Sequence, residues 1–149
     1  MTLYRATADG NVAMSPTEEA GVIAEWAEYN SLLNKKTRLL ERLTMKRESV
    51  EYGGALVNGS LIATDLTSQS KLTGALNFVG RNPARQIKWK AKDGAFVALT
   101  RVQIESIADT VGEFVAKCYD NEAAHAAAID ALLTVDAVDA YDMSTGWPI

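Results

Sequence analysis

Apolar side chains recur at spacings of three and four residues between Ser15 and Glu48, which is the pattern of one long amphipathic helix. Ser15 and Glu18 form a capping-box sequence at its start, and Pro16 suits the first helical position. A helix of roughly 30 residues exceeds the usual globular length. We therefore expect it to pack along another helix or another chain. The recurring positions form a heptad seam that contains Val22, Trp26, Tyr29, Leu33, Lys36, Leu40, Leu43 and Arg47.

The seam leaves two main interpretations open. The helix either lies on its own domain or forms a coiled coil with another chain, and fraying or a kink is a third alternative. Lys36 is a polar residue within the seam, and such a residue can fix register or oligomeric state. The candidate interface residues are the seam positions through Leu43 together with Trp147. Trp147 stands near the end of the chain, where an aromatic ring must fold back or anchor in a neighbour.

After residue 48 the pattern alternates between paired strands and helices. Asn58-Gly59 and Asp93-Gly94 are tight-turn sequences, as is Asp9-Gly10 before the long helix. Runs of paired strands between helices favour an α+β fold with antiparallel strands. The expected elements are hairpins at 2–14, 50–64 and 87–99, and helices at 66–80, 100–133 and 134–140.

Composition is ordinary for a globular protein, with 48% hydrophobic and 23% charged residues among 149. We divide the chain into residues 1–48, an attachment or oligomerisation segment, and residues 49–149, an α+β domain. No apolar run is long enough to cross a bilayer, and the first residues lack the features of a secretory signal. Synthesis in a cytoplasm is therefore expected.

Charge is segregated along the chain. Residues 1–34 hold one basic and five acidic side chains, and residues 35–117 hold 14 basic and 8 acidic ones. Residues 118–149 hold six acids and no lysine or arginine. A basic middle between acidic ends predicts complementary contacts within the chain or between subunits.

The sequence offers little catalytic chemistry. No glycine-rich phosphate loop is present, and His125 is the sole histidine. Cys118, Glu122 and His125 would share one helix face, but a fourth zinc ligand is lacking, so packing is the favoured interpretation. We expect no catalytic residue, metal or cofactor, and no nucleic-acid or membrane partner. The basic residues of the long helix fit a solvated helix face better than a nucleic-acid site.

From about residue 42 to the end, the chain resembles a domain that recurs near the C-terminus of bacteriophage tail-fibre and tail-assembly proteins. The shared features, in order, are a Tyr-Gly-Gly segment, an Asn-Gly hairpin, a serine-rich helix, a strand with Trp89, a long alanine-rich helix and a terminal Gly-Trp-Pro. The first 41 residues lie outside the resemblance.

This resemblance implies a non-enzymatic structural protein of the virion tail, at the tail tip, baseplate or fibre attachment. Its partners would be other tail or fibre proteins and further copies of itself, with a trimer favoured by the family. The alternative is a chaperone of fibre or tail assembly that leaves the mature particle.

Overall fold

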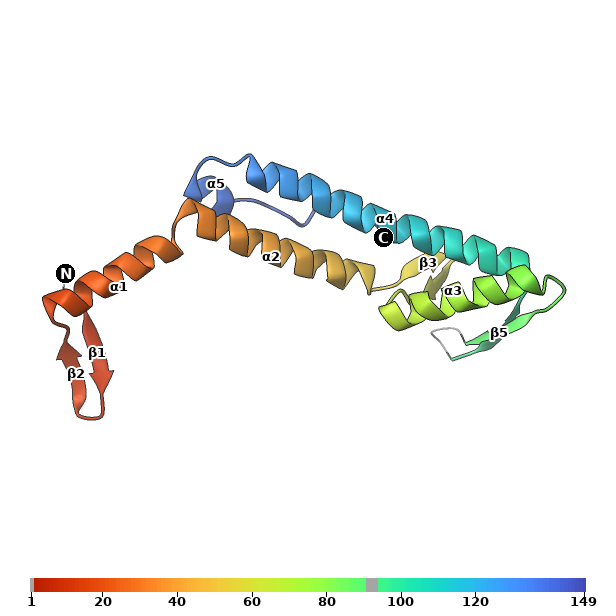
Figure 1. Cartoon of the computed structure of the whole chain (residues 1–149), viewed down its shortest axis with the longest axis horizontal. Helices are drawn as coiled ribbons and strands as arrows, with labels where there is room; N and C mark the ends of the chain where they lie inside the picture. The colour runs from red at the N-terminus through yellow and green to blue at the C-terminus, as the bar shows by residue number, and fades with distance from the viewer. Residues whose placement is uncertain (1, 91–93) are drawn as a thin grey trace.

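The computed structural model describes residues 2–90 and 94–149, and hairpins alternate with helices along them (Figure 1). Each hairpin is its own two-stranded antiparallel sheet, which confirms the expected α+β class. In chain order the elements are β1 (Tyr4–Thr7), β2 (Gly10–Ala13), α1 (Pro16–Tyr29), α2 (Leu32–Glu51), β3 (Ala55–Val57), β4 (Ser60–Ile62), α3 (Leu66–Arg81), β5 (Ile87–Lys90), β6 (Phe96–Leu99), α4 (Arg101–Asp130) and α5 (Val135–Asp139).

The expected single helix from Ser15 to Glu48 is wrong. Two helices occupy this stretch, α1 with 14 residues and α2 with 20, and they meet at an angle (Figure 1). Asn30 ends α1, and its side-chain nitrogen donates a 2.8 Å hydrogen bond to the Trp26 carbonyl. Ser31 begins α2 with extended backbone, and its hydroxyl accepts the Asn34 N–H. Adjacent C-cap and N-cap residues thus interrupt the helix.

The body of the molecule is built on α2 and α4, which run antiparallel side by side (Figure 1). One apolar cluster joins Leu39 and Leu43 of α2 to Ile129 of α4 and Val138 of α5. A second cluster lies between α3, α4 and the hairpins, and its buried residues are Ala55, Leu72, Ala75, Val79, Leu99, Ile104, Val111, Phe114 and Cys118. Helix α2 is therefore part of the body's core.

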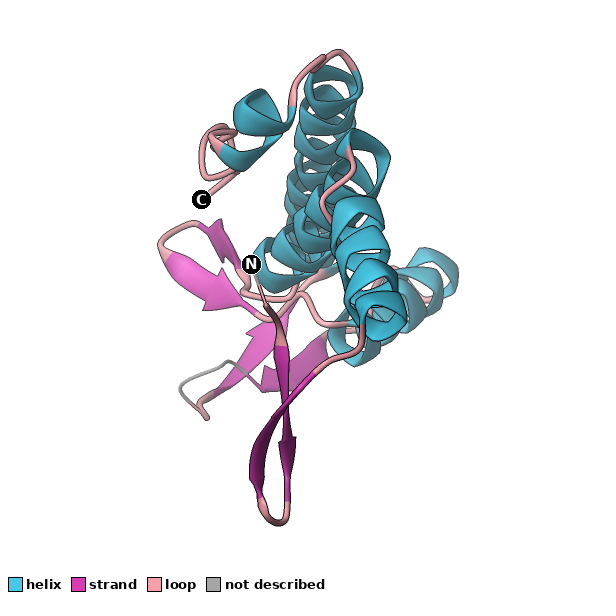
Figure 2. Cartoon of the chain, turned by 90° about the vertical axis from the view of Figure 1, so that its left-hand side faces the viewer, coloured by secondary structure: helices cyan, strands magenta, loops and turns pink. Residues whose placement is uncertain are grey.

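The β3–β4 hairpin turns at Asn58 and Gly59, both with positive φ, as the Asn-Gly sequence predicts. Its first strand begins at Ala55, so residues 50–54, expected as strand, instead finish α2 and turn. Position 54 requires glycine, because its φ is +105° and a Cβ there would lie 2.9 Å from Leu61 Cδ1. The expected turn at Asp93 lies outside the described residues. In a view along the long axis the hairpins lie to one side of the helices (Figure 2), although β1–β2 is at the opposite end of the molecule from the hairpins of the body (Figure 1).

Candidate functional site

The N-terminal residues 2–30, here called the arm, comprise β1, β2 and α1 and project from one end of the body (Figure 1). No side chain of these three elements is buried. The hairpin is tied to the start of α1 by two contacts. The Leu3 N–H donates a 2.6 Å hydrogen bond to Glu19, and Arg5 pairs with Glu18. The arm thus holds its own shape by polar contacts without a core.

An arm without a core is marginal by itself. An isolated two-stranded hairpin is barely stable in water, and so is a lone helix of this length. The arm also exposes large apolar side chains: Ile23 is 55% exposed and Trp26 is 53% exposed. Both features are typical of a segment that completes its packing on a partner surface.

The junction of α1 and α2, here called the elbow, is held by side chains that reach across it. The Arg38 guanidinium carbon lies 3.8 Å from the centre of the Tyr29 ring, and Arg38 donates a 2.6 Å hydrogen bond to the Tyr29 carbonyl. Asn34 donates a 2.7 Å hydrogen bond to the Glu28 carbonyl. These contacts fix the direction in which the arm leaves the body.

The predicted seam is divided at the elbow. Trp26, Tyr29 and Leu33 are exposed, and Val22 is half-buried. Leu43 is buried within the chain, and Leu40 packs on the same cluster. Lys36 donates a hydrogen bond to the Asp130 carbonyl at the end of α4. The seam through Leu33, in the first turn of α2, therefore faces outward or is half-buried, and its later α2 positions contribute to the body.

Trp147 folds back onto α4, which is one of the two alternatives that its position near the end of the chain left open. Its ring stacks on His125 with centroids 5.9 Å apart, and its Nε1–H donates to the Met143 carbonyl at 2.8 Å. His125 Nε2 lies 3.1 Å from the Thr145 carbonyl, which can only accept, so the proton sits on Nε2. Nδ1 then accepts from the Tyr141 hydroxyl at 2.7 Å. The sole histidine thereby holds the C-terminal tail.

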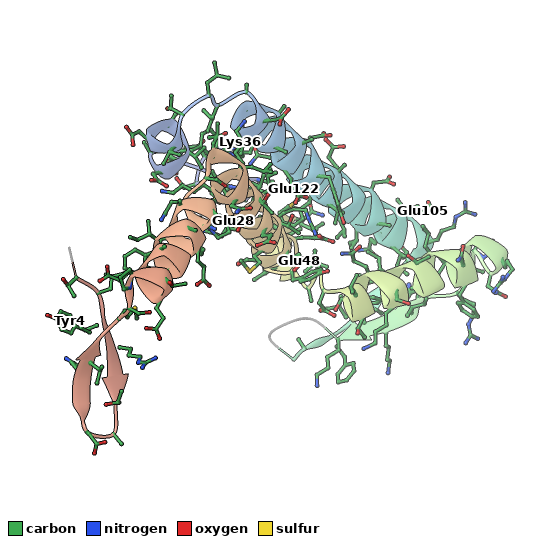
Figure 3. The ribbon with its side chains drawn as sticks, turned by 60° about the vertical axis from the view of Figure 1, so that its left-hand side comes forward. Tyr4, Glu28, Lys36, Glu48, Glu105 and Glu122 are labelled. Atoms are coloured by element: carbon green, nitrogen blue, oxygen red, sulfur yellow. The ribbon has the colours of Figure 1, made fainter. Side chains whose placement is uncertain are left out.

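A buried ionic cluster joins α2 to α4 between the two apolar clusters. Arg47 pairs with Glu51 one turn along α2, and its Nε lies 2.8 Å from Glu122 of α4 without the alignment of a hydrogen bond. Figure 3 shows Glu122 on the side of α4 that faces α2. Burial opposes the charge of Arg47, but Tyr119, Glu122 and Glu51 outweigh it and raise its pKa. The cluster therefore joins α2 to α4 by charge in addition to the apolar contacts.

The acidic C-terminal region contacts the basic middle within the same chain, as the charge pattern predicts. Lys35 of α2 pairs with Asp139 of α5, and Arg47 contacts Glu122. Among the described residues, the acidic side chains of the arm form no ion pair with the basic middle.

The candidate metal ligands serve other contacts. Cys118 is fully buried among apolar side chains, and burial raises the pKa of its thiol. Glu122 pairs with Arg47, and both ring nitrogens of His125 have partners. Across residues 2–90 and 94–149, no group of three or more histidine, cysteine, aspartate or glutamate side chains is placed to hold a metal ion.

Sequence reasoning missed a groove at the end of the body opposite the arm. It lies between β4, α3 and β5, holds about 450 Å³, and is bordered by Lys71, Lys88 and Lys90. The only signal was the alternation of lysine with apolar residues along residues 86–90.

In the part of the chain that the structure describes, no helix combines the length and apolarity needed to cross a membrane.

A comparison with protein families matches residues 34–144 to the domain of unknown function DUF4376. The chain belongs to this family. The matched region begins just after the elbow and therefore coincides with the body, while the arm lies outside it. No curated protein and no solved structure matches the chain.

Proposed function

We propose that this DUF4376 protein is a non-enzymatic structural component of a bacteriophage tail, placed at the tail tip, baseplate or fibre attachment. The body serves as a folded module, and the arm attaches it to tail proteins or to further copies, with a trimer as the favoured assembly. The proposal takes its location from the resemblance of residues 42–149 to tail-fibre and tail-assembly proteins.

The observation that carries the attachment role is the exposed arm. Its helix and hairpin bury no side chain, yet Trp26 and Ile23 present large apolar surfaces. Folding such a segment costs conformational entropy that its own contacts do not offset. Contact with a partner would supply the missing burial, as expected of a protein that works through protein–protein interfaces.

Quantitative mass spectrometry of purified virions tests this function. We expect the protein in the mature particle at a fixed ratio to the other tail proteins. Its presence in infected cells but absence from particles would overturn the structural role and favour the assembly chaperone instead. Localisation by labelled antibodies would then place the virion-bound protein at the tail.

A further inference from the structure

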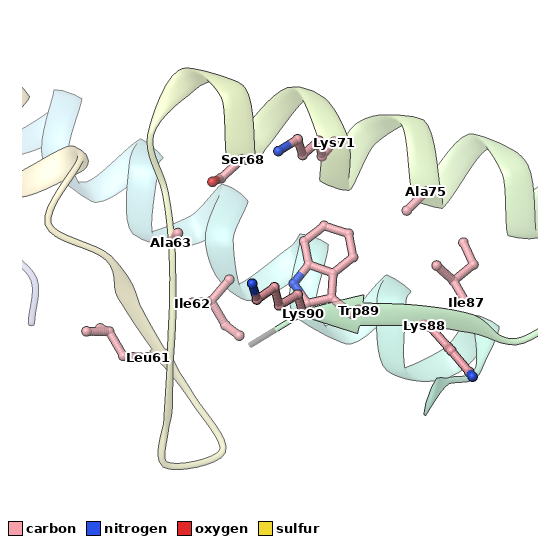
Figure 4. Close-up of a pocket in the computed structure, with 10 residues that line it drawn as sticks. All are labelled: Leu61, Ile62, Ala63, Ser68, Lys71, Ala75, Ile87, Lys88, Trp89 and Lys90. Carbon is pink, nitrogen blue, oxygen red and sulfur yellow. The ribbon is translucent and has the colours of Figure 1, made fainter. Parts of the chain in front are cut away.

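The groove at the far end of the body has an apolar floor and a basic border. Ile62, Ala75 and Ile87 form part of the floor, and the Trp89 ring points toward α3 (Figure 4). Lys71 projects from α3, and Lys88 and Lys90 project from β5. None of the described residues that line it is acidic. The groove therefore suits an apolar segment that carries negative charge.

These lysines have no acidic partner in the described chain. Lys90 lies 5.9 Å from the centre of the Phe96 ring, and none of the three forms an ion pair with a described residue. An anionic occupant would supply the counter-charge that these three lysines lack among the described residues.

The arm carries the complementary features. Glu25 and Glu28 of α1 are exposed and make no ion pair with the described residues, and Tyr29, which is 59% exposed, lies four residues after Glu25. Residues at spacings of three and four share a helix face. Glu25 and Tyr29 therefore share one face of α1, and Trp26 borders the same face three residues before Tyr29. This face presents an acidic group beside apolar ones, the arrangement that helix-in-groove binding uses.

We propose that the arm of one copy docks into the basic groove of a second copy, so that the chains assemble head to tail. A chain cannot fill its own groove, because the arm and the groove lie at opposite ends of the body (Figure 1). They are separated by the 20 residues of α2, a length of about 30 Å. The contact joins two different surfaces, so it closes into a ring or extends as a filament.

The exposed area fits this arrangement. The chain exposes 9846 Å², whereas a compact monomer of this mass exposes about 7,400 Å². A standard interface covers about 800 Å² on each partner. A chain that gives its arm to one neighbour and its groove to another covers about 1,600 Å², which is within the excess of roughly 2,400 Å². The inference rests on the arm's proposed attachment role, and a closed ring of three would be the favoured trimer.

Paired charge reversals in the full chain test the proposal by sedimentation velocity. The arm variant carries Glu25→Lys and Glu28→Lys, and the groove variant carries Lys88→Glu and Lys90→Glu. We expect each variant by itself to associate at least about tenfold more weakly than the unaltered protein, because like charges then meet across the contact. An equimolar mixture should associate again into pairs and even-numbered or open assemblies, in which each arm meets a groove of opposite sign, but not into a ring of three, where the two variants cannot alternate.

Two further variants control for net charge alone. Glu41→Lys with Asp120→Lys and Arg42→Glu with Lys117→Glu make the same charge changes at exposed sites on α2 and α4, and both should associate like the unaltered protein. Circular dichroism melting confirms that each variant folds.

A groove variant that associates like the unaltered protein would overturn the proposal and favour an arm-to-arm contact. A full chain that stays monomeric at every accessible concentration would overturn it as well. Neither outcome decides whether the protein is in the virion, which the mass spectrometry measures separately.

Discussion

Asn30 and Ser31 are neighbours in the chain but belong to different helices, Asn30 as the C-cap of α1 and Ser31 as the N-cap of α2. Their side chains satisfy backbone groups on opposite sides of the elbow, the Trp26 carbonyl and the Asn34 N–H. Because of this pair, the apolar face of α2 lies on α4 while α1 leaves the body. The elbow therefore separates the folded body from the arm.

Ser31→Ala should lower the free energy of unfolding by about 1 kcal/mol, because the first turn of α2 loses its capping acceptor. Thr37→Ala is the control, since Thr37 only bonds the carbonyl four residues earlier on an exposed helix face, and its effect should stay within about 0.5 kcal/mol. Urea unfolding measures both. Equal effects would show that the cap does not stabilise the elbow.

Arg47→Ala should destabilise the body by about 3–5 kcal/mol, since Glu51 and Glu122 would both lose the cation that they contact. Glu51 is only 3% exposed, so water cannot replace the lost partner. Arg42→Ala, on the exposed side of the same helix, is the matched control and should change stability little. Thermal unfolding distinguishes them. A loss below about 1 kcal/mol for Arg47→Ala would mean that the carboxylates find other partners.

Trp147→Ala should lower the free energy of unfolding by about 2 kcal/mol, because the ring covers His125 and the α2–α4–α5 cluster. The loss is smaller than for a fully buried tryptophan, since the ring is only half-buried. The comparison variant is Leu133→Ala, at a position 84% exposed, which should be close to neutral. Acrylamide quenching of tryptophan fluorescence gives an independent readout. Full quenching of the Trp147 contribution would place the ring in water and contradict the packing.

Low pH should destabilise the first turn of α3. The Ser68 hydroxyl and the Ser68 N–H both donate hydrogen bonds to the Asp65 carboxylate. These bonds, that from the hydroxyl most of all, hold the pKa of Asp65 below its usual range. A carboxyl with a lowered pKa in the folded state stabilises above its unfolded pKa of about 3.9, and this stabilisation is lost as pH falls through the folded value. Asp65→Asn keeps the cap but cannot titrate, so its deficit relative to the unaltered protein should shrink between pH 6 and pH 2. Asp109→Asn, at an exposed position of α4, serves as the control. A deficit that does not vary with pH would rule out this linkage.

The local signals in the sequence predicted most elements because each depends on nearby residues. The Asn58-Gly59 turn, the Asp65 and Thr100 caps, and the alternation along residues 86–90 lie where the corresponding elements form. The elbow was missed because Asn30 and Ser31 fall between seam positions, so the helical period continues unbroken across two capping residues.

The groove was beyond sequence reasoning for a different reason. Its lining comes from residues near 62, 71 and 89, which only the packing of α3 on α4 brings together. The same is true of the division between arm and body. Periodicity placed Leu43 on the same seam as Trp26, but Leu43 packs in one cluster with Ile129, 86 positions along the chain. For this reason we expect the folding unit to begin near Ser31 and not at residue 49.

Sedimentation equilibrium of the full chain beside a fragment of residues 31–149, with a melting curve for each, tests the separation of attachment from folding most directly. The account predicts that the fragment melts cooperatively within a few degrees of the full chain and remains monomeric at concentrations where the full chain self-associates. A fragment that associates as strongly as the full chain, or one that fails to melt cooperatively, would contradict it.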